Sequence, residues 1–418
     1  MTVQTEIPAS DLTETMLDMG VRARAASRAL GRLDAADRTR GLKAIAAAIR
    51  AATPTILEAN RLDMEAAREK GLDAAMLDRL ALDQARVEGI VSGVEAIAVL
   101  PDPIGREMAR WTQPNGLDFA RVAVPLGVIG IIYESRPNVT ADAGTLCLRS
   151  GNAAVLRCGS ESTRSSHALV DAMRAALTKE NLPADAIQLV GTTDRAAVGQ
   201  MLSGLDGKVD VIVPRGGRSL VERVQKDARV PVIGHLEGLC HMYVDAGADP
   251  QKAVDLVVNA KMRRTGVCGS LETLLIDAAV AEALLPVIAA ALTEAGCEMR
   301  GDAAARVIVP EMNTATEADW GTEYLAPILA VAVVDGLDGA LAHIERWSSG
   351  HTDSIVTEDQ AIADKFLGRV DSAIVLHNAS TQFADGGEFG FGAEIGIATG
   401  RIHARGPVGA EQLTIYKY

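Results

Sequence analysis

The spacing of hydrophobic residues predicts that the chain opens with a layer of helices. Within residues 13–100 the apolar side chains recur every three or four positions, as at Leu42, Ile45, Ala46 and Ile49. That period puts the apolar side chains on one face of each helix. Pro101 and Pro103 end the layer, because proline cannot continue a helix.

Beyond residue 121 the pattern changes to short apolar runs separated by helical stretches. A first set of runs covers residues 122–133, 153–157, 187–191, 209–214 and 230–234. A second set covers residues 271–277, 306–310, 328–335, 353–357 and 373–377. Strands that alternate with helices predict parallel sheets with crossover helices, and the two sets predict two α/β domains.

Two further segments are expected to lie outside these sheets. Residues 111–121 have Pro114-Asn115-Gly116 at their centre and predict a hairpin or an extended arm that packs on another subunit. Residues 386–409 are rich in glycine, but they also carry Phe389, Phe391 and Ile395. We therefore expect an ordered loop there.

The composition limits the class of protein. A chain of 418 residues with 48% apolar residues is too long for one ordinary core. Aromatic residues make up only 3%, which suits helices packed on parallel strands better than base-stacking surfaces. The net charge of −14, from 41 basic and 55 acidic residues, argues against nucleic-acid binding. The negative net charge still allows local arginine pockets that bind a phosphorylated small molecule.

The cysteines and the chain start predict a reduced, cytoplasmic protein. The five cysteines are widely spaced, with no CxxC pair and no metal-ligand spacing, so we expect neither disulfides nor a metal site. Residues 1–11 lack the features of an export signal, and no run of 18 apolar residues follows. We expect neither export nor membrane attachment.

Cys268 is the leading candidate for a nucleophile. It lies between small residues just before the apolar run 271–277, where a flat carbonyl group has room to approach. The nearby Arg263 and Arg264 favour the thiolate over the thiol. The alternative is a buried cysteine that packs as a small hydrophobic residue, and the local sequence leaves both open.

Asn138 is a candidate donor to a developing oxyanion, because its amide follows the apolar run 122–133. Equally, it could cap a helix that starts near Val139.

Two loops are candidates for cofactor binding. Arg157, Gly159 and Ser160 end a short strand and suit a ribose or a 2′-phosphate; the alternative is a surface arginine with Ser160 as a helix cap. Gly216 and Gly217 open a helix, so their amides could bind a pyrophosphate. A plain turn would look the same.

Acidic residues beside glycine and histidine form a third group. Glu237 lies between His235 and His241 and could serve as a general base. A structural role is the commoner fate of such histidines. Glu323 precedes a predicted strand and could accept hydrogen bonds from cofactor ribose, or could cap or pair.

Taken in order, five segments resemble the aldehyde dehydrogenase superfamily, and the resemblance spans nearly the whole chain. The segments are residues 133–140, 235–241, 267–275, 347–353 and 389–397. Within the superfamily, the chain is similar to the reductases that act on L-glutamyl 5-phosphate in proline biosynthesis. The resemblance implies an α/β fold with two Rossmann-like parallel-sheet domains and a small oligomerisation arm. The implied parts are a cofactor-binding domain (1–108 and 122–236), a catalytic domain (237–395), and an arm and tail (109–121 and 396–418).

The resemblance also implies roles for single residues. Cys268 corresponds to the nucleophile, and Asn138 forms the oxyanion hole with the Cys268 amide. Residues 157–160 hold the adenosine ribose of NADP(H), and Glu323 the nicotinamide ribose. Glu237, which we group with the cofactor residues, falls where hydrolytic relatives keep a water-activating base. Gly269 follows the nucleophile where asparagine is expected.

The implied reaction is the NADPH-dependent reduction of L-glutamyl 5-phosphate through a cysteine thioester. Arg136, Arg263 and Arg264 are candidates for the substrate carboxylate, since paired donors suit it. The alternatives are a hydrolytic aldehyde dehydrogenase that uses Glu237, or a catalytically silent scaffold for a proline-pathway kinase. The expected partners are a second copy of the chain, in a dimer or tetramer, and a separate glutamate 5-kinase that hands over its product.

Overall fold

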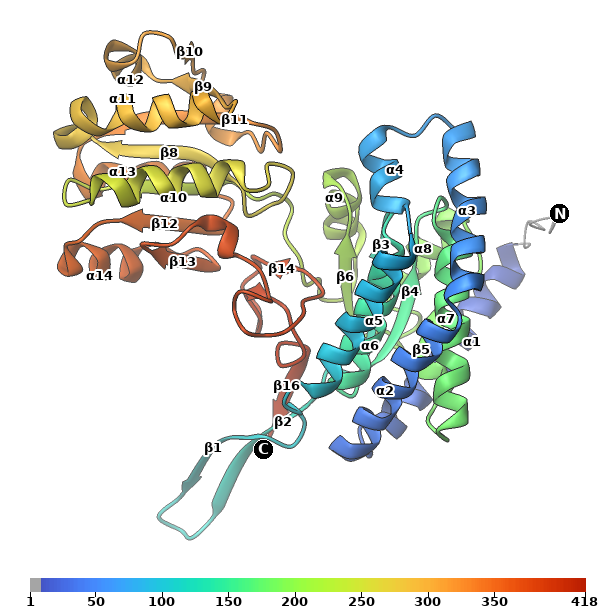
Figure 1. Cartoon of the computed structure of the whole chain (residues 1–418). Helices are drawn as coiled ribbons and strands as arrows, with labels where there is room; N and C mark the ends of the chain where they lie inside the picture. Colours follow the sequence, from blue (N-terminus) through green and yellow to red (C-terminus); the bar gives the residue numbers. More distant parts are fainter. Residues whose placement is uncertain (1–8) are drawn as a thin grey trace. The chain divides into compact units, whose positions relative to one another are not determined.

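The computed structural model describes residues 9–418, which form two compact units (Figure 1). The first unit contains the chain up to Gly234 together with Gly390–Gly396 and Val408–Tyr418. The second contains His235–Phe389 and Ile397–Pro407. The expectation that no export signal is present rests largely on residues 1–8, which lie outside the described residues. From residue 9 onward, no helix is long and apolar enough to cross a bilayer.

A four-stranded parallel sheet forms the centre of the first unit. Its strands lie in the order β5-β4-β3-β6, which are Ile187–Leu189, Ala153–Arg157, Val128–Tyr133 and Val211–Arg215. In chain order this is third, second, first, fourth, the arrangement of doubly wound nucleotide-binding sheets. All six residues of β3 are buried, as expected of a central strand with helices on both faces. A bridge from Ile212 to Val232 extends the sheet beyond β6.

Helices cover this sheet in two layers. The helices are α1 (Ala9–Leu30), α2 (Ala35–Ala51), α3 (Thr53–Glu69), α4 (Ala74–Leu80), α5 (Gln84–Val99), α6 (Pro137–Arg149), α7 (Thr163–Lys179), α8 (Arg195–Leu202) and α9 (Arg218–Asp227). Helices α1, α6 and α7 contact the strands, while α2, α3 and α5 pack on α6 and α7. The predicted helical opening of the chain is therefore confirmed, with α1 on the sheet and α2, α3 and α5 in an outer layer.

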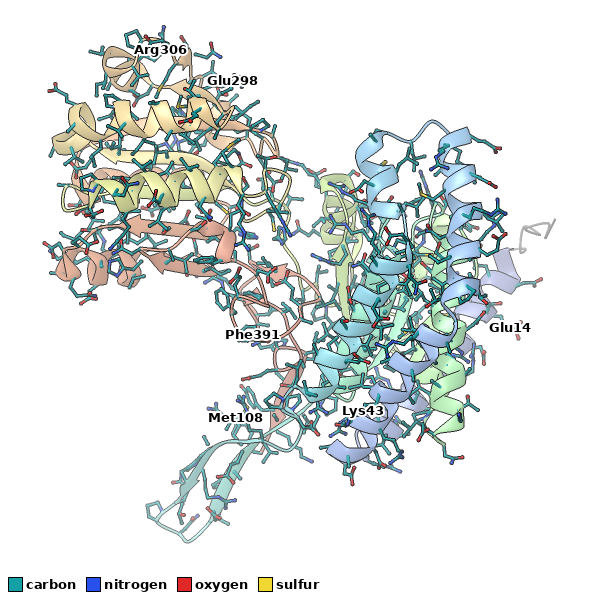
Figure 2. The ribbon with its side chains drawn as sticks, in the orientation of Figure 1. Glu14, Lys43, Met108, Glu298, Arg306 and Phe391 are labelled. Carbon is teal, nitrogen blue, oxygen red and sulfur yellow. The ribbon has the colours of Figure 1, made fainter. Side chains whose placement is uncertain are left out.

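A three-stranded antiparallel sheet forms the arm of the first unit (Figures 1 and 2). Its order is β1-β2-β16, which are Glu107–Thr112, Asp118–Pro125 and Thr414–Lys417. The predicted hairpin is confirmed, with its turn between β1 and β2. The run 122–133 is two strands, because Gly127 breaks it with a φ of 128°, where a Cβ would lie 2.1 Å from an Asp210 oxygen.

A seven-stranded parallel sheet forms the centre of the second unit. Its order is β10-β9-β11-β8-β7-β12-β13. The strands are Asn313–Thr314, Glu298–Gly301, Ile328–Val334, Leu271–Asp277, Cys240–Val244, Thr352–Val356 and Ile374–His377. One hydrophobic core packs α10 (Pro250–Met262), α11 (Ala278–Glu294) and α12 (Ala303–Ile308) on one face. A second packs α13 (Gly336–Trp347) and α14 (Gln360–Arg369) on the other.

The two parallel sheets confirm the predicted α/β fold, but two predicted strands are wrong. Residues 230–234 form no strand, because only Val232 makes a bridge to the sheet. Residues 306–310 were expected to be extended, yet Arg306 lies in the helix α12 (Figure 2). Asp302 caps this helix by accepting a hydrogen bond from the Ala305 amide, and the alanines that follow favour a helix. Strands β7, β9 and β10 were not predicted. The assignment of cofactor binding to one unit and catalysis to the other stays a prediction.

Candidate active site

Cys268 lies at the amino end of β8, in the loop that follows α10. It is partly exposed, whereas the four other cysteines of the described chain are buried. Burial raises the pKa of Cys147 and of Cys240 above the usual range for a thiol. Cys268 is therefore the cysteine that a substrate can reach.

The backbone of Cys268 is packed against Gly238. A Cβ at position 238 would lie 2.1 Å from the Cys268 carbonyl oxygen and 2.9 Å from its Cα, so only glycine fits there. The Cys240 thiol donates a hydrogen bond to the same carbonyl at 3.1 Å. Strands β7 and β8 are neighbours, and their amino ends thus fix the position of the cysteine.

Two histidines lie beside the Cys268 sulfur. A ring nitrogen of His235, a ring nitrogen of His351 and the sulfur all lie within 4.8 Å of one another. The Nδ1 of His235 donates to the Ile397 carbonyl at 2.7 Å, so in the neutral ring its Nε2 is an acceptor. His351 is buried; its Nδ1 is 2.9 Å from the Thr352 hydroxyl, and its Nε2 has no hydrogen-bond partner among the described residues. Either histidine ring can therefore accept the proton of the Cys268 thiol.

Among the described residues, the same three side chains form the one group of three or more His, Cys, Asp or Glu that could hold a metal ion. A zinc ion in tetrahedral coordination holds its ligands less than about 4 Å apart, given bonds of about 2.0–2.3 Å. The observed separation of up to 4.8 Å is wider than this. That the protein uses no metal stays a prediction.

Glu323 and Glu237 lie beside Gly238, the glycine that contacts Cys268. The Glu323 carboxylate accepts a hydrogen bond from the Gly238 amide at 2.9 Å. Glu237 is the residue before Gly238 and is partly buried. Glu323 therefore holds the turn against which Cys268 packs. The residues around Glu323 in the sequence did not indicate this contact.

A buried ion pair lies beneath this loop. Lys261 and Glu272 are almost fully buried, with 2.7 Å between the ammonium nitrogen and a carboxylate oxygen. Burial raises the pKa of Glu272 to about 7, although Lys261 acts in the opposite direction. The other Glu272 oxygen accepts from the Leu325 amide at 3.3 Å. The pair thus connects α10 and β8 to the segment that carries Glu323.

In the first unit, Asn138 lies on the first turn of α6 and does not cap it. The helix begins at Pro137, and its N-cap residue is Arg136. The exposed Asn138 side chain donates one amide hydrogen to Asp142 at 3.0 Å. An amide nitrogen carries two hydrogens, so one remains for a ligand. The capping alternative is therefore wrong.

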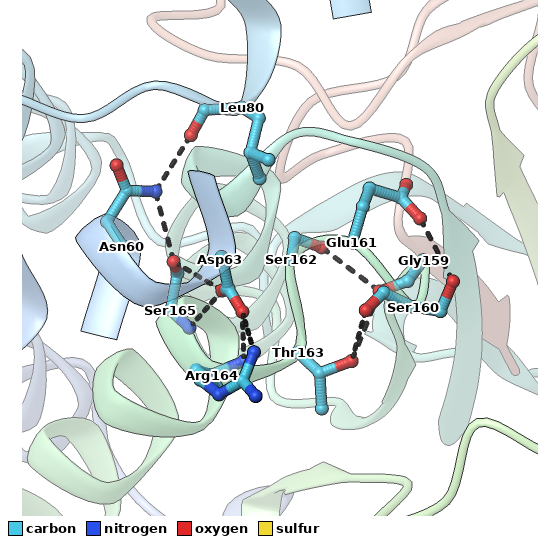
Figure 3. Close-up of polar contacts among 10 residues, drawn as sticks. All are labelled: Asn60, Asp63, Leu80, Gly159, Ser160, Glu161, Ser162, Thr163, Arg164 and Ser165. Carbon is cyan, nitrogen blue, oxygen red and sulfur yellow. Dashed lines mark hydrogen bonds and ion pairs between the residues drawn. The ribbon is translucent and has the colours of Figure 1, made fainter. Parts of the chain in front are cut away.

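The loop after β4 carries Arg157, Gly159 and Ser160. Arg157 is not a surface arginine: it donates to the Thr193 carbonyl at 3.2 Å, and its buried Nε has no partner among the described residues. Ser160 is exposed and does not cap α7. The N-terminal amides of α7 are bound by Asp63, which accepts from Ser165 at 2.8 Å (Figure 3). A cofactor phosphate would therefore meet Arg157 and Ser160 while Asp63 occupies the helix end.

The turn after β6 carries the exposed Gly216 and Gly217. The Gly217 amide donates to the Glu134 carboxylate at 2.9 Å, and a Cβ at position 216 would lie 2.4 Å from the same carboxylate oxygen. Glu134 follows β3, the neighbour of β6, so both residues lie at the carboxyl ends of adjacent strands. That edge is where doubly wound sheets bind nucleotides.

The three candidate arginines have different surroundings. Arg263 is exposed and pairs with Glu388 at 3.0 Å. Arg264 is exposed, four residues before Cys268. Arg136 lines a cavity of the first unit together with Asn138. Sequence reasoning did not single out His351 or Asp142. His351 is distant from Cys268 along the chain, whereas Asp142 lies one helical turn after Asn138, a spacing that could have indicated it.

Comparisons with known proteins show what the chain is similar to. The model of the aldehyde dehydrogenase family matches residues 3–307. The chain is 76% identical to a γ-glutamyl phosphate reductase of Hyphomonas neptunium, covering 100% of this chain and 98% of the relative. It is 62% identical to the enzyme of the same name from Caulobacter vibrioides, covering 96% and 98%. Among solved structures, the γ-glutamyl phosphate reductase of Thermotoga maritima has a TM-score of 0.94 at 44% identity, covering 96% of this chain and 97% of that one.

Proposed function

The chain belongs to the γ-glutamyl phosphate reductases of the aldehyde dehydrogenase family, and we propose that it reduces L-glutamyl 5-phosphate with NADPH. The products are L-glutamate 5-semialdehyde and phosphate, and the reaction is the second step of proline biosynthesis from glutamate. The observation that carries the proposal is the reachable Cys268, fixed by Gly238 and Cys240 and flanked by two histidines. The five free cysteines fit a reducing cytoplasm.

The first half of the reaction forms a thioester. His351 or His235 accepts the thiol proton, and the Cys268 thiolate attacks the acyl carbon of the substrate. The negative charge on the acyl oxygen is stabilised by the Cys268 amide and by the free hydrogen of the Asn138 amide. The bond from carbon to the phosphate oxygen then breaks, and phosphate leaves.

The second half consumes the thioester. NADPH, when bound, supplies the hydride that reduces the thioester carbonyl. The same donors stabilise the oxygen a second time, and the resulting thiohemiacetal collapses to release the aldehyde and the Cys268 thiolate. The reaction needs a sulfur nucleophile because thiolate both attacks and leaves readily.

The residues of the first unit fit a phosphorylated nucleotide. The unpartnered Nε of Arg157, the exposed Ser160 hydroxyl, and the Gly216 and Gly217 turn supply donors for ribose and phosphate groups. Gly159 leaves space in this loop, and Glu161 fills part of it. In the second unit, Glu323 and Glu237 are the acceptors we assign to the nicotinamide ribose. NADP(H) is preferred over NAD(H) because Arg157 can bind a 2′-phosphate.

The chain acts as a homo-oligomer, and a separate glutamate 5-kinase supplies the unstable acyl phosphate. Arg264 and Arg263 extend from the loop of the nucleophile and favour approach of the anionic substrate.

The test is the reverse reaction, in which purified protein reduces NADP⁺ with L-glutamate 5-semialdehyde, with and without phosphate. Turnover is expected to require phosphate and to be lost in Cys268→Ala, whereas Cys297→Ala retains it. Turnover without phosphate would indicate a hydrolytic dehydrogenase that uses Glu237. No turnover with any acyl phosphate or aldehyde would indicate a scaffold protein.

A further inference from the structure

A cavity of about 410 Å³ lies in the first unit, directly beside Asn138. Its lining carries charged groups of both signs. The charged and amide side chains are Asp78, Arg79, Arg86, Arg136, Asn138 and Asp142. Such a mixture suits a small ligand that carries both a positive and a negative group.

Asp142 supplies the negative charge on the inner side of this cavity. It lies one turn along α6 from Asn138, and one of its oxygens accepts the Asn138 amide hydrogen at 3.0 Å. Burial raises its pKa to about 6, although Asn138 and Arg215 both act to lower it. The half-buried carboxylate faces the cavity, and a bound cation would stabilise its ionised form.

Three arginines supply the positive charge. Arg86 is held in position by Asp78, with 2.6 Å between the paired atoms, and by the Ala81 carbonyl at 2.9 Å. Arg79 is exposed and forms no hydrogen bond or ion pair with any described residue. Arg136 precedes α6 and is partly buried. Both terminal nitrogens of Arg86 donate to Asp78 and to nearby carbonyls, so we assign a ligand carboxylate to Arg79 and Arg136.

We propose that this cavity binds the α-amino and α-carboxylate groups of the substrate, with the ammonium on Asp142 and the carboxylate on Arg79 and Arg136. The inference rests on the proposed function, in which the Asn138 amide contacts the acyl oxygen. Three carbon atoms separate the acyl carbon of L-glutamyl 5-phosphate from its amino nitrogen. The Asn138 amide nitrogen and an Asp142 oxygen lie 3.0 Å apart, so one substrate molecule can place its acyl oxygen on the first and its ammonium group on the second.

The experiment compares three aldehydes in the phosphate-dependent reverse reaction with NADP⁺. L-glutamate 5-semialdehyde carries both groups, 5-oxopentanoate lacks the amino group, and 4-aminobutanal lacks the carboxylate. The readout is the ratio of kcat/KM between two aldehydes, because a loss of Asn138 positioning lowers both values and cancels in the ratio.

In the wild type, L-glutamate 5-semialdehyde is expected to exceed 5-oxopentanoate by about 100-fold, the magnitude of a buried charge pair. Asp142→Asn reduces that ratio to near 1, and Arg136→Gln reduces the ratio of L-glutamate 5-semialdehyde to 4-aminobutanal. Asp171→Asn, which changes an exposed acid of α7 outside the cavity lining, serves as the control and leaves both ratios as they are.

Equal ratios in the wild type and Asp142→Asn would overturn the assignment. If the wild type fails to turn over L-glutamate 5-semialdehyde at all, the proposed function fails instead.

Thermal unfolding shows that the variant is folded and also tests the burial of Asp142. The folded pKa of about 6 lies above the unfolded value of about 3.9, so ionisation destabilises the wild type as pH rises through 6. Asp142→Asn should therefore gain stability relative to the wild type at pH 8 but not at pH 4.

Discussion

At the scale of single residues, Gly238 determines where the proposed nucleophile, Cys268, lies. Adding a methyl group in Gly238→Ala would press on the Cys268 carbonyl group, and all three of the nearest atoms belong to the backbone. The segment that carries the sulfur must therefore move. A displacement of about 1 Å at a reacting group costs about 100-fold in rate, which is the fall in kcat/KM that we expect.

Gly266→Ala is the matched control for this prediction. It lies two residues before Cys268, and a Cβ there meets no atom within 4 Å. Its kcat/KM should stay within a few-fold of the wild type. Alkylation of Cys268 by iodoacetamide gives an independent measurement, and an equal alkylation rate in Gly238→Ala and wild type would show that the sulfur has not moved.

The sequence predicted those site residues whose chemistry is local. Cys268 is flanked by small residues, and the structure shows the partial exposure that this pattern indicated. The roles of Gly238 and His351 could not be predicted, because each depends on contacts across strand ends that adjacent residues do not reveal. The amino ends of β7, β8 and β12 meet only once the sheet order is known.

At the scale of elements, the Lys261–Glu272 pair joins α10 to β8 inside the second unit. Glu272→Leu removes the carboxylate and leaves a buried ammonium without a counter-ion. Such a change typically costs about 3–5 kcal/mol of unfolding free energy. Urea unfolding followed by the fluorescence of Trp320 and Trp347, both in the second unit, measures this loss.

The double variant Lys261→Met with Glu272→Leu is the control. It replaces both charges by apolar groups, and the cost should fall well below that of Glu272→Leu alone, because no unpaired charge remains. If the double variant is as unstable as the single one, the pair is not isolated from water in the way that its burial indicates.

Helices and strands were predicted correctly where the spacing of apolar residues alone determines the local structure. The runs 153–157 and 271–277 are mostly apolar and form β4 and β8. The run 306–310 is also mostly apolar, but the Asp302 cap and the alanines before the run form α12. Strand β7 was missed because His241 falls inside it. The His241 side chain can be buried because it forms a hydrogen bond with Asp353 at 3.0 Å, and Asp353 lies more than a hundred residues away along the chain.

At the scale of the whole molecule, the arm sheet has two unpaired edges, β1 and β16. Exposed strand edges and exposed aromatic side chains are expected to be covered by another chain. Trp111 stacks on Phe119 with 5.7 Å between ring centroids, and Tyr416 and Tyr418 are exposed nearby. The expectation from the sequence, that the arm and the tail build the oligomer, therefore has a definite surface on which to be tested.

We predict that Trp111→Glu combined with Tyr416→Glu converts the oligomer into a monomer. The added carboxylates carry charge that pairing of two arms would have to bury, at a cost that exceeds the gain from the aromatic contacts. Light scattering at micromolar concentration measures the mass of each form. The control is Val307→Glu. Val307 is 81% exposed and lies in the second unit, outside the arm sheet, so this variant should keep the mass of the wild type. A wild type that is already monomeric would contradict the prediction, and an oligomer that survives the double change would mean that a different surface of the molecule forms the interface.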